Sequence, residues 1–202
     1  MIAVIDYGVG NLFSLVSSLK MVSADSIVTS APEEIRKADK IILPGVGAFE
    51  DAKRKLVESG LETVIKEEVT KGKPIFGICL GMQMLFEKSY EYGEHEGLGL
   101  LKGSVVPMEG KIPENLKIPH IGWNALSVKK EHPIFKYTKD GDFVYFVHSY
   151  YAEGVGESLL ATAEYGRELT AAVALGNVTG TQFHPEKSGE AGLRILKAFA
   201  EW

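Results

Sequence analysis

The sequence predicts an α/β fold in three layers, with helices on both faces of a mostly parallel sheet and an antiparallel extension in the second half. Two observations support this prediction. In the first half, short apolar runs alternate with segments of helical spacing, which is typical of βα units. In the second half, strand-like runs follow one another with few helical segments between them. One domain over residues 1–202 is expected, because the length is near the usual size of a domain and no linker interrupts it.

The first half contains four candidate buried strands, each a short apolar run that ends at glycine, proline or polar residues. They are Ile2–Ile5, Ser26–Thr29, Ile41–Leu43 and Pro74–Ile78. Helical spacing between them predicts helices from Leu12 to Leu19, over Asp51–Val57 and over Leu61–Val69. A further helix is expected to begin at Ser30-Ala31-Pro32-Glu33, which has the pattern of a capping box with Ser30 as the acceptor.

The second half begins with a polar, acidic loop, expected from Ser89 to Gly97. The strand-like runs that follow are Ser104–Pro107, Phe143–Val147, Leu159–Glu164, Thr170–Leu175 and Val178–Phe183. A final amphipathic helix is expected, because Leu193, Leu196 and Phe199 recur on one helical face.

Composition excludes several classes of function. A net charge of −5 argues against non-specific binding to nucleic acid or anionic membrane. No apolar run reaches the roughly 18 residues that span a bilayer, and no basic region opens the chain as in a signal peptide. The single cysteine excludes an intramolecular disulfide and a metal cage of several thiolates. A cytoplasmic location is therefore expected.

That single cysteine, Cys79, stands between two glycines in Gly77-Ile78-Cys79-Leu80-Gly81, after a predicted strand and before Met82–Phe86, which has helical character. This pattern is typical of a sharp strand-to-helix turn that carries a nucleophile, where larger flanking side chains would collide with their surroundings. The positive end of the helix would favour a thiolate, and the Leu80 N–H would suit an oxyanion. A buried structural cysteine is the alternative.

A thiol nucleophile needs a base, and the chain offers five histidines, His95, His120, His132, His148 and His184. His184 is favoured because Glu186 follows it by two residues, so both side chains project to the same side of an extended segment. His148 is the rival, for which a binding or structural role is expected. His95 and His132 are expected on the solvated surface.

Two motifs, Lys73-Pro74-Ile75-Phe76-Gly77-Ile78-Cys79-Leu80-Gly81-Met82-Gln83 and Phe183-His184-Pro185-Glu186, resemble those of class I (triad) glutamine amidotransferases. Three further segments, Asp6–Asn11, Pro44–Phe49 and Pro119–Asn124, resemble the glutaminase subunits of imidazole glycerol phosphate synthases, which act in histidine biosynthesis. The resemblance covers essentially the whole chain and implies a flavodoxin-like domain. An amidotransferase subunit of another synthase, a γ-glutamyl hydrolase and a non-catalytic binding subunit of the same fold are the alternatives.

The resemblance implies a role for each matching residue. Cys79 would attack the side-chain amide of glutamine to give a thioester, with His184 as the base and Glu186 orienting it. Backbone N–H groups of Leu80 and of the loop at Val46 and Gly47 would hold the oxyanion. The residues implied in glutamine binding are Gln83, Glu91, Ser149 and Tyr150. For Gln83, a solvated helix residue is the alternative.

The resemblance also implies a partner and no metal or organic cofactor. Ammonia would pass to a (β/α)8 cyclase subunit in a heterodimer, which makes imidazole glycerol phosphate and the purine-pathway intermediate AICAR. The residues implied at the interface or its gate are Asn11, Trp123, Asn124, Tyr145 and Lys187. For Trp123, a half-buried core position is the alternative.

Overall fold

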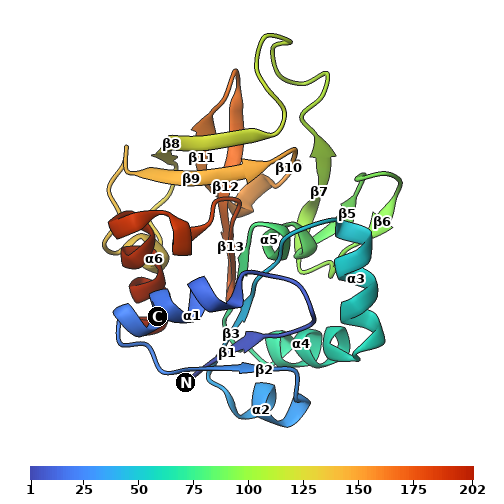
Figure 1. Cartoon of the computed structure of the whole chain (residues 1–202), viewed down its shortest axis with the longest axis vertical. Helices are drawn as coiled ribbons and strands as arrows, with labels where there is room; N and C mark the ends of the chain where they lie inside the picture. Colours follow the sequence, from blue (N-terminus) through green and yellow to red (C-terminus); the bar gives the residue numbers. More distant parts are fainter.

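The structure, a computed structural model, describes residues 1–202 and is built around a nine-stranded sheet with the order β2-β1-β3-β4-β13-β12-β11-β8-β9 (Figure 1). The first five positions are parallel and follow the flavodoxin-like strand order. These strands are β1 (Ile2–Ile5), β2 (Ser26–Thr29), β3 (Lys40–Leu43), β4 (Ile75–Ile78) and β13 (Val178–Thr181). The antiparallel part comprises β8 (His120–Val128), β9 (Phe143–His148), β11 (Leu159–Glu164) and β12 (Glu168–Leu175). The predicted fold class is thus confirmed.

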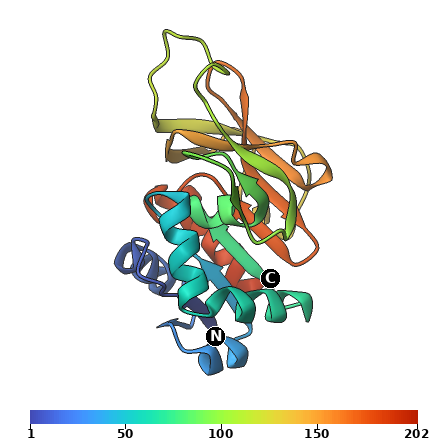
Figure 2. The same cartoon turned by 90° about the vertical axis from the view of Figure 1, so that its right-hand side faces the viewer.

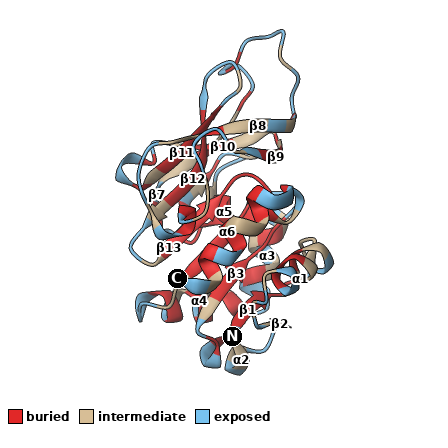
Figure 3. Ribbon diagram, turned by 90° about the vertical axis from the view of Figure 1, so that its left-hand side faces the viewer, coloured by how far each residue is buried: buried red, intermediate tan, exposed pale blue.

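Helices cover both faces of the parallel part, and its inner strands β1, β3, β4 and β13 are largely buried (Figure 3). The edge strand β2 is partly exposed. On β1, Ala3 and Ile5 pack in one core with α2 (Pro32–Lys37), α3 (Phe49–Glu58) and α4 (Leu61–Thr70). Ile2 and Val4 face the other core, with α1 (Leu12–Met21) and α6 (Gly189–Glu201). This alternation is what a strand with two buried faces requires. No helix is long and apolar enough to cross a membrane.

A second, four-stranded sheet lies beside the first, and the sequence did not predict it (Figure 2). Its order is β10-β7-β5-β6, with β10 (Tyr150–Glu153), β7 (Leu101–Pro107), β5 (Phe86–Ser89) and β6 (His95–Glu96). The expected helix over Met82–Phe86 is wrong at its end: α5 (Leu80–Met84) stops early, because Phe86 is fully buried and pairs with Leu101 in this sheet. The expected acidic loop likewise contains β6. Three 3₁₀ turns complete the chain, η1 (Pro133–Phe135), η2 (Gly156–Ser158) and η3 (Pro185–Lys187).

The capping box expected at Ser30 is also wrong. Ala31 is the N-cap residue of α2 and makes no side-chain hydrogen bond. The hydroxyl of Thr29 accepts instead from the Ala31 N–H at 2.9 Å and donates to the carboxylate of Glu34. The helix start is therefore stabilised by a side chain from the end of β2, one position earlier than the pattern indicates.

The neighbouring strands β4 and β13 determine where chemistry can take place. Ile78 at the end of β4 pairs with Thr181 at the end of β13, and the Cys79 N–H donates to the Thr181 carbonyl at 2.7 Å. The turn after β4 and the segment after β13 therefore leave the sheet at the same carboxyl edge. Ligands bind at this edge in open α/β sheets.

Candidate active site

The turn after β4 holds Cys79 in a conformation that side chains rarely adopt, with φ 53° and ψ −109°. Glycine is needed on both sides of Cys79, because a side chain at either position would collide with nearby backbone atoms. A Cβ atom on Gly77 would lie 2.7 Å from the Gly81 carbonyl oxygen, and a Cβ on Gly81 would lie 1.8 Å from the Leu43 carbonyl oxygen. The predicted steric reason for the two glycines is confirmed. Leu80 opens α5, so its N–H has no acceptor within the helix.

The glycine loop after β3 packs directly against this turn. A Cβ on Gly45 would lie 2.9 Å from both the Gly81 nitrogen and the Tyr7 hydroxyl. That hydroxyl donates to the Pro44 carbonyl at 2.7 Å, and burial raises the pKa of Tyr7 well above its usual value, so it stays neutral and keeps its proton. The first strand and the third strand thus fix the loop beside Cys79.

His184 and Glu186 form a buried hydrogen-bonded pair. His184 Nδ1 donates to Glu186 Oε1 at 2.8 Å, while His184 Nε2 is buried without a partner. The predicted contact is confirmed, but the extended segment expected to produce it is wrong, because Pro185–Lys187 form the 3₁₀ turn η3. Burial lowers the pKa of His184, but the attraction of Cys79 and Glu186 and the hydrogen bond to Glu186 outweigh it and raise this pKa to about 10. The ring therefore carries a positive charge at neutral pH, and a charged ring beside a sulfur favours the thiolate.

Strand β9 and helix α6 hold the His184 segment in place. The His184 N–H donates to the Tyr145 carbonyl at 3.0 Å, and the Ser188 hydroxyl donates to the His184 carbonyl at 2.6 Å. Gly192 in α6 lies against the same turn, because a Cβ there would be 1.8 Å from the Pro185 carbonyl oxygen. The position of the base is therefore set by two elements, strand β9 and the start of helix α6.

One cavity of about 260 Å³ gathers most of the predicted site residues. It is lined by Val46, Gly47, Cys79, Leu80, Gln83, Glu91, Tyr92, Val147, His148, Ser149, Tyr150 and His184. Every residue predicted for the oxyanion or for glutamine binding is among them. Glu186 is not, because it sits behind His184. No three His, Cys, Asp or Glu side chains gather so as to hold a metal ion.

Two of the predicted glutamine-binding side chains already have partners. Gln83 is only 6% exposed, so the alternative of a solvated helix residue is wrong; its Nε2 donates to the Tyr150 carbonyl at 3.1 Å and to Gln182 Oε1 at 3.0 Å. Glu91 accepts a hydrogen bond from the Phe49 N–H at 2.5 Å. This carboxylate therefore caps α3, which has no cap of its own and follows the glycine loop.

His148 lines the cavity and pairs with His120. His148 Nδ1 donates to the Tyr150 carbonyl at 2.8 Å and its Nε2 lies 3.1 Å from His120 Nδ1, so neither nitrogen is free to act as a base. Burial lowers the pKa of His148 to about 3. These contacts agree with the expected structural role of His148. The expectation for the other two histidines is wrong: His95 and His132 are half-buried, His95 6.4 Å from the ring of Phe49 and His132 5.2 Å from that of Trp202.

The residues predicted for the partner interface lie in different places. Trp123 is 52% exposed and packs edge-on against Tyr145, its paired neighbour on β9, so the core alternative is wrong. Lys187 is exposed. Asn11 and Asn124 make contacts within the chain. Asn11 accepts from the Ser14 N–H at the start of α1, and Asn124 donates to the Glu164 carbonyl at 2.8 Å.

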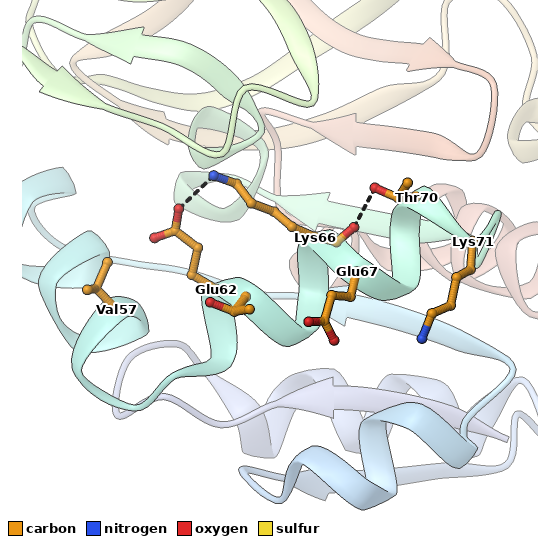
Figure 4. Close-up of a pocket in the computed structure, with 7 residues that line it drawn as sticks. Val57, Glu62, Lys66, Glu67, Thr70 and Lys71 are labelled. Atoms are coloured by element: carbon orange, nitrogen blue, oxygen red, sulfur yellow. Dashed lines mark hydrogen bonds and ion pairs between the residues drawn. The ribbon is translucent and has the colours of Figure 1, made fainter.

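Another hollow lies along α4, next to the end of α3, and lacks the cysteine and histidine of this cavity (Figure 4). Its charged groups are held in ion pairs: Lys66 lies 2.8 Å from Glu62, while Glu67 pairs with Arg36 and Lys71 with Glu68. The Thr70 hydroxyl donates to the Lys66 carbonyl. It contains no cysteine or histidine and only one apolar side chain, Val57. The cavity at Cys79 is therefore the candidate active site.

Comparison with known proteins agrees with this geometry. The model of the family "Glutamine amidotransferase class-I" matches residues 3–201. The chain belongs to the class I glutamine amidotransferase family. It is a glutamine amidotransferase enzyme of the glutaminase type.

Relatives within this family are similar over their full length. The imidazole glycerol phosphate synthase subunit HisH of Bacillus licheniformis is 52% identical, over 100% of this chain and 96% of that protein. The HisH subunit of Caldanaerobacter subterraneus is 53% identical over 100% and 98%, and that of Aquifex aeolicus 50% identical over 97% and 94%. This amidotransferase therefore groups with the HisH subunits.

Solved structures share the fold at lower identity. A glutamine amidotransferase has a TM-score of 0.77 at 21% identity and covers 99% of both chains. The structure of PurLQS from Thermotoga maritima has a TM-score of 0.76 at 21% identity, over 99% of this chain and 97% of that one. This level of identity supports the fold alone.

Proposed function

We propose that this amidotransferase is the glutaminase subunit of an imidazole glycerol phosphate synthase, active as one domain over residues 1–202 in the cytoplasm. The observation that carries the proposal is the position of Cys79, at a strained turn in the same cavity as a histidine with a raised pKa. The HisH relatives, 50–53% identical, supply the pathway.

The reaction begins with attack of the Cys79 sulfur on the side-chain amide carbon of glutamine. The resulting oxyanion accepts hydrogen bonds from the Leu80 N–H and from the loop at Val46 and Gly47; one such donor contributes about 2.7–4 kcal/mol to the transition state. As the C–N bond breaks, the charged His184 gives its proton to the departing nitrogen, and ammonia leaves a thioester on Cys79. The now neutral ring takes a proton from water, which hydrolyses the thioester to glutamate and restores the thiolate–imidazolium pair.

The far end of glutamine carries an ammonium and a carboxylate, which need polar partners for selection. Gln83, Glu91, Ser149 and Tyr150 line the cavity and supply acceptors and donors of the required kinds. Because Glu91 already accepts from the Phe49 N–H, an ammonium group would share its carboxylate with the start of α3.

Ammonia is useful only if it reaches its acceptor before it is lost to water, so the glutaminase acts with a (β/α)8 cyclase subunit in a heterodimer. The cyclase uses the ammonia to make imidazole glycerol phosphate and AICAR. The exposed Trp123, with Tyr145 beside it, provides an aromatic anchor of the kind that dominates interface energies. Asn11, Asn124 and Lys187 are assigned to the same interface or its gate.

The first test compares the wild type with Cys79→Ser and Cys79→Ala, assayed for glutamine hydrolysis with and without a cyclase subunit and its nucleotide ligand. Both variants should lose activity and still bind the cyclase, because the reacting sulfur is removed while the fold stays intact. Full activity of Cys79→Ala would contradict the mechanism. Co-purification with a different synthase would favour another amidotransferase, and a Cys79 that a glutamine-derived electrophile fails to label would favour a non-catalytic subunit.

A further inference from the structure

Gln182 is a buried polar residue that the mechanism above does not use. It directly follows β13, its exposed fraction is 0%, and its N–H donates to the Ala171 carbonyl at 2.8 Å, which fixes its backbone. Burial of a carboxamide is unfavourable unless its polar atoms find partners. Both of its partners belong to the site: its Nε2 lies 3.6 Å from Cys79 Sγ, and its Oε1 accepts from Gln83 Nε2 at 3.0 Å.

The orientation of the two carboxamides follows from a single backbone group. The Tyr150 carbonyl can only accept, so Gln83 must turn its NH2 group toward it, at 3.1 Å. The second hydrogen of this NH2 group points to Gln182, which must therefore present its oxygen. The NH2 group of Gln182 is then the end that faces the sulfur of Cys79.

This arrangement has a consequence for each partner. An N–H aimed at the sulfur stabilises the thiolate more than the thiol, because only the charged form is a strong acceptor. Both amide hydrogens of Gln83 donate to groups of the protein, while its Oε1 accepts no hydrogen bond from any protein group. Gln83 lines the cavity, so this oxygen is its group available to the ammonium end of glutamine.

We propose that Gln182 is a positioning residue that holds the Cys79 sulfur and the Gln83 amide in one hydrogen-bonded row, so that nucleophile and substrate-binding group keep fixed places relative to each other. The proposal rests on the proposed function, in which Cys79 attacks glutamine and Gln83 binds it. It links the two through a side chain that touches neither the substrate nor the leaving group.

The test uses Gln182→Met, which keeps the length of the side chain and removes its donor and acceptor. The rate of Cys79 alkylation by iodoacetamide at pH 7 is measured in the free subunit, and kcat and KM for glutamine in the complex with the cyclase. The alkylation rate should fall, and KM rise, by about tenfold each, the effect of losing a hydrogen bond to a charged or binding group. Gln182→Leu repeats the test with a second apolar side chain.

Thr179→Val is the matched control, because Thr179 is equally buried on β13 and its hydroxyl donates to the Ile75 carbonyl, away from the site. A variant of Gln83, Gln83→Met, completes a double-mutant cycle. The KM effects of Gln182→Met and Gln83→Met should not add, because the first acts through the second, whereas the alkylation effect of Gln182→Met should persist without Gln83.

Two results would overturn the proposal: alkylation and KM in Gln182→Met and Gln182→Leu that match Thr179→Val, or KM effects of Gln182→Met and Gln83→Met that simply add. A wild-type complex without glutaminase activity would instead contradict the proposed function. The alkylation comparison in the free subunit, which needs no turnover, would still decide whether Gln182 acts on the sulfur.

Discussion

The charge on His184 depends on residues that the chain brings from two directions. Glu186 follows it by two residues, and this short spacing was enough to predict their contact, although the segment forms a 3₁₀ turn and not the extended chain that was expected. Cys79 arrives from another strand, and its contribution to the raised pKa needs the fold. Local and distant contacts also differ at the nucleophile. The Gly-x-Cys-x-Gly pattern predicts Cys79 as the nucleophile, but the contact of Gln182 with Cys79 spans 103 residues and has no local signal in the sequence.

Replacement of Glu186 by glutamine should lower the pKa of His184 from about 10, because the ring loses an ion-pair partner while its burial remains. In the wild type the ring should keep its charge as pH rises past 6.5 and lose it only near 10. Glutamine can also bind the wrong tautomer of the ring, which in the Ser-His-Asp template costs about 10⁴-fold in kcat. NMR titration of His184 and the glutaminase rate measure the two effects.

Glu190→Gln is the control for this variant, because Glu190 is an exposed carboxylate at the start of α6. An unchanged His184 titration together with an unchanged kcat in Glu186→Gln would remove Glu186 from the site.

Elements with a clear local pattern of apolar residues were predicted closely from the sequence, and elements that depend on distant contacts were not. Ile2–Ile5, Ser26–Thr29 and Leu159–Glu164 form strands with the predicted bounds, because short apolar or β-branched runs between turn residues leave few alternatives. By contrast, Phe86 continues the apolar pattern of α5 and yet begins β5, because pairing with Leu101 outweighs local preference. The second sheet was missed for the same reason.

Gly192→Ala tests how helix α6 supports the site. Alanine inside a helix usually stabilises by about 1 kcal/mol relative to glycine. Here the sign should reverse, with a loss of about 1–3 kcal/mol, because the added Cβ would overpack against the Pro185 carbonyl. The glutaminase rate should fall as well, since the displaced turn carries His184. Chemical denaturation and activity assays of Gly192→Ala and of Glu190→Ala, an exposed position in the same helix, measure both effects.

A stabilised Gly192→Ala protein with wild-type activity would show that α6 can move away from the turn at no cost. That result would remove the helix from the description of the site.

The stability of the whole molecule should depend on pH through His148. Burial lowers its folded pKa to about 3, while the unfolded chain binds a proton near 6.5. As pH falls from 6.5 toward 3, the unfolded state alone gains this proton, so the free energy of unfolding should decrease by about 1.4 kcal/mol per pH unit from this group. His120 and His184 face the same ring and oppose its protonation.

His148→Asn keeps a donor for the Tyr150 carbonyl and cannot titrate in this range. Its destabilisation relative to the wild type, measured by urea unfolding, should therefore shrink between pH 8 and pH 4.5. A constant difference between the two proteins across this range would contradict the depressed pKa.

The pairing of β13 with β4 also determines when, during synthesis of the chain, the active site can form. Cys79 and the first four parallel strands are synthesised long before β13, which enters the middle of the sheet between β4 and β12. A growing chain that has not reached Val178 has a nucleophile with no base, no Gln182 and an unpaired edge on β4. Closing such a long loop is a slow, entropically costly step. The ability to hydrolyse glutamine therefore arises only once the last strand is inserted, so that an unfinished chain releases no ammonia.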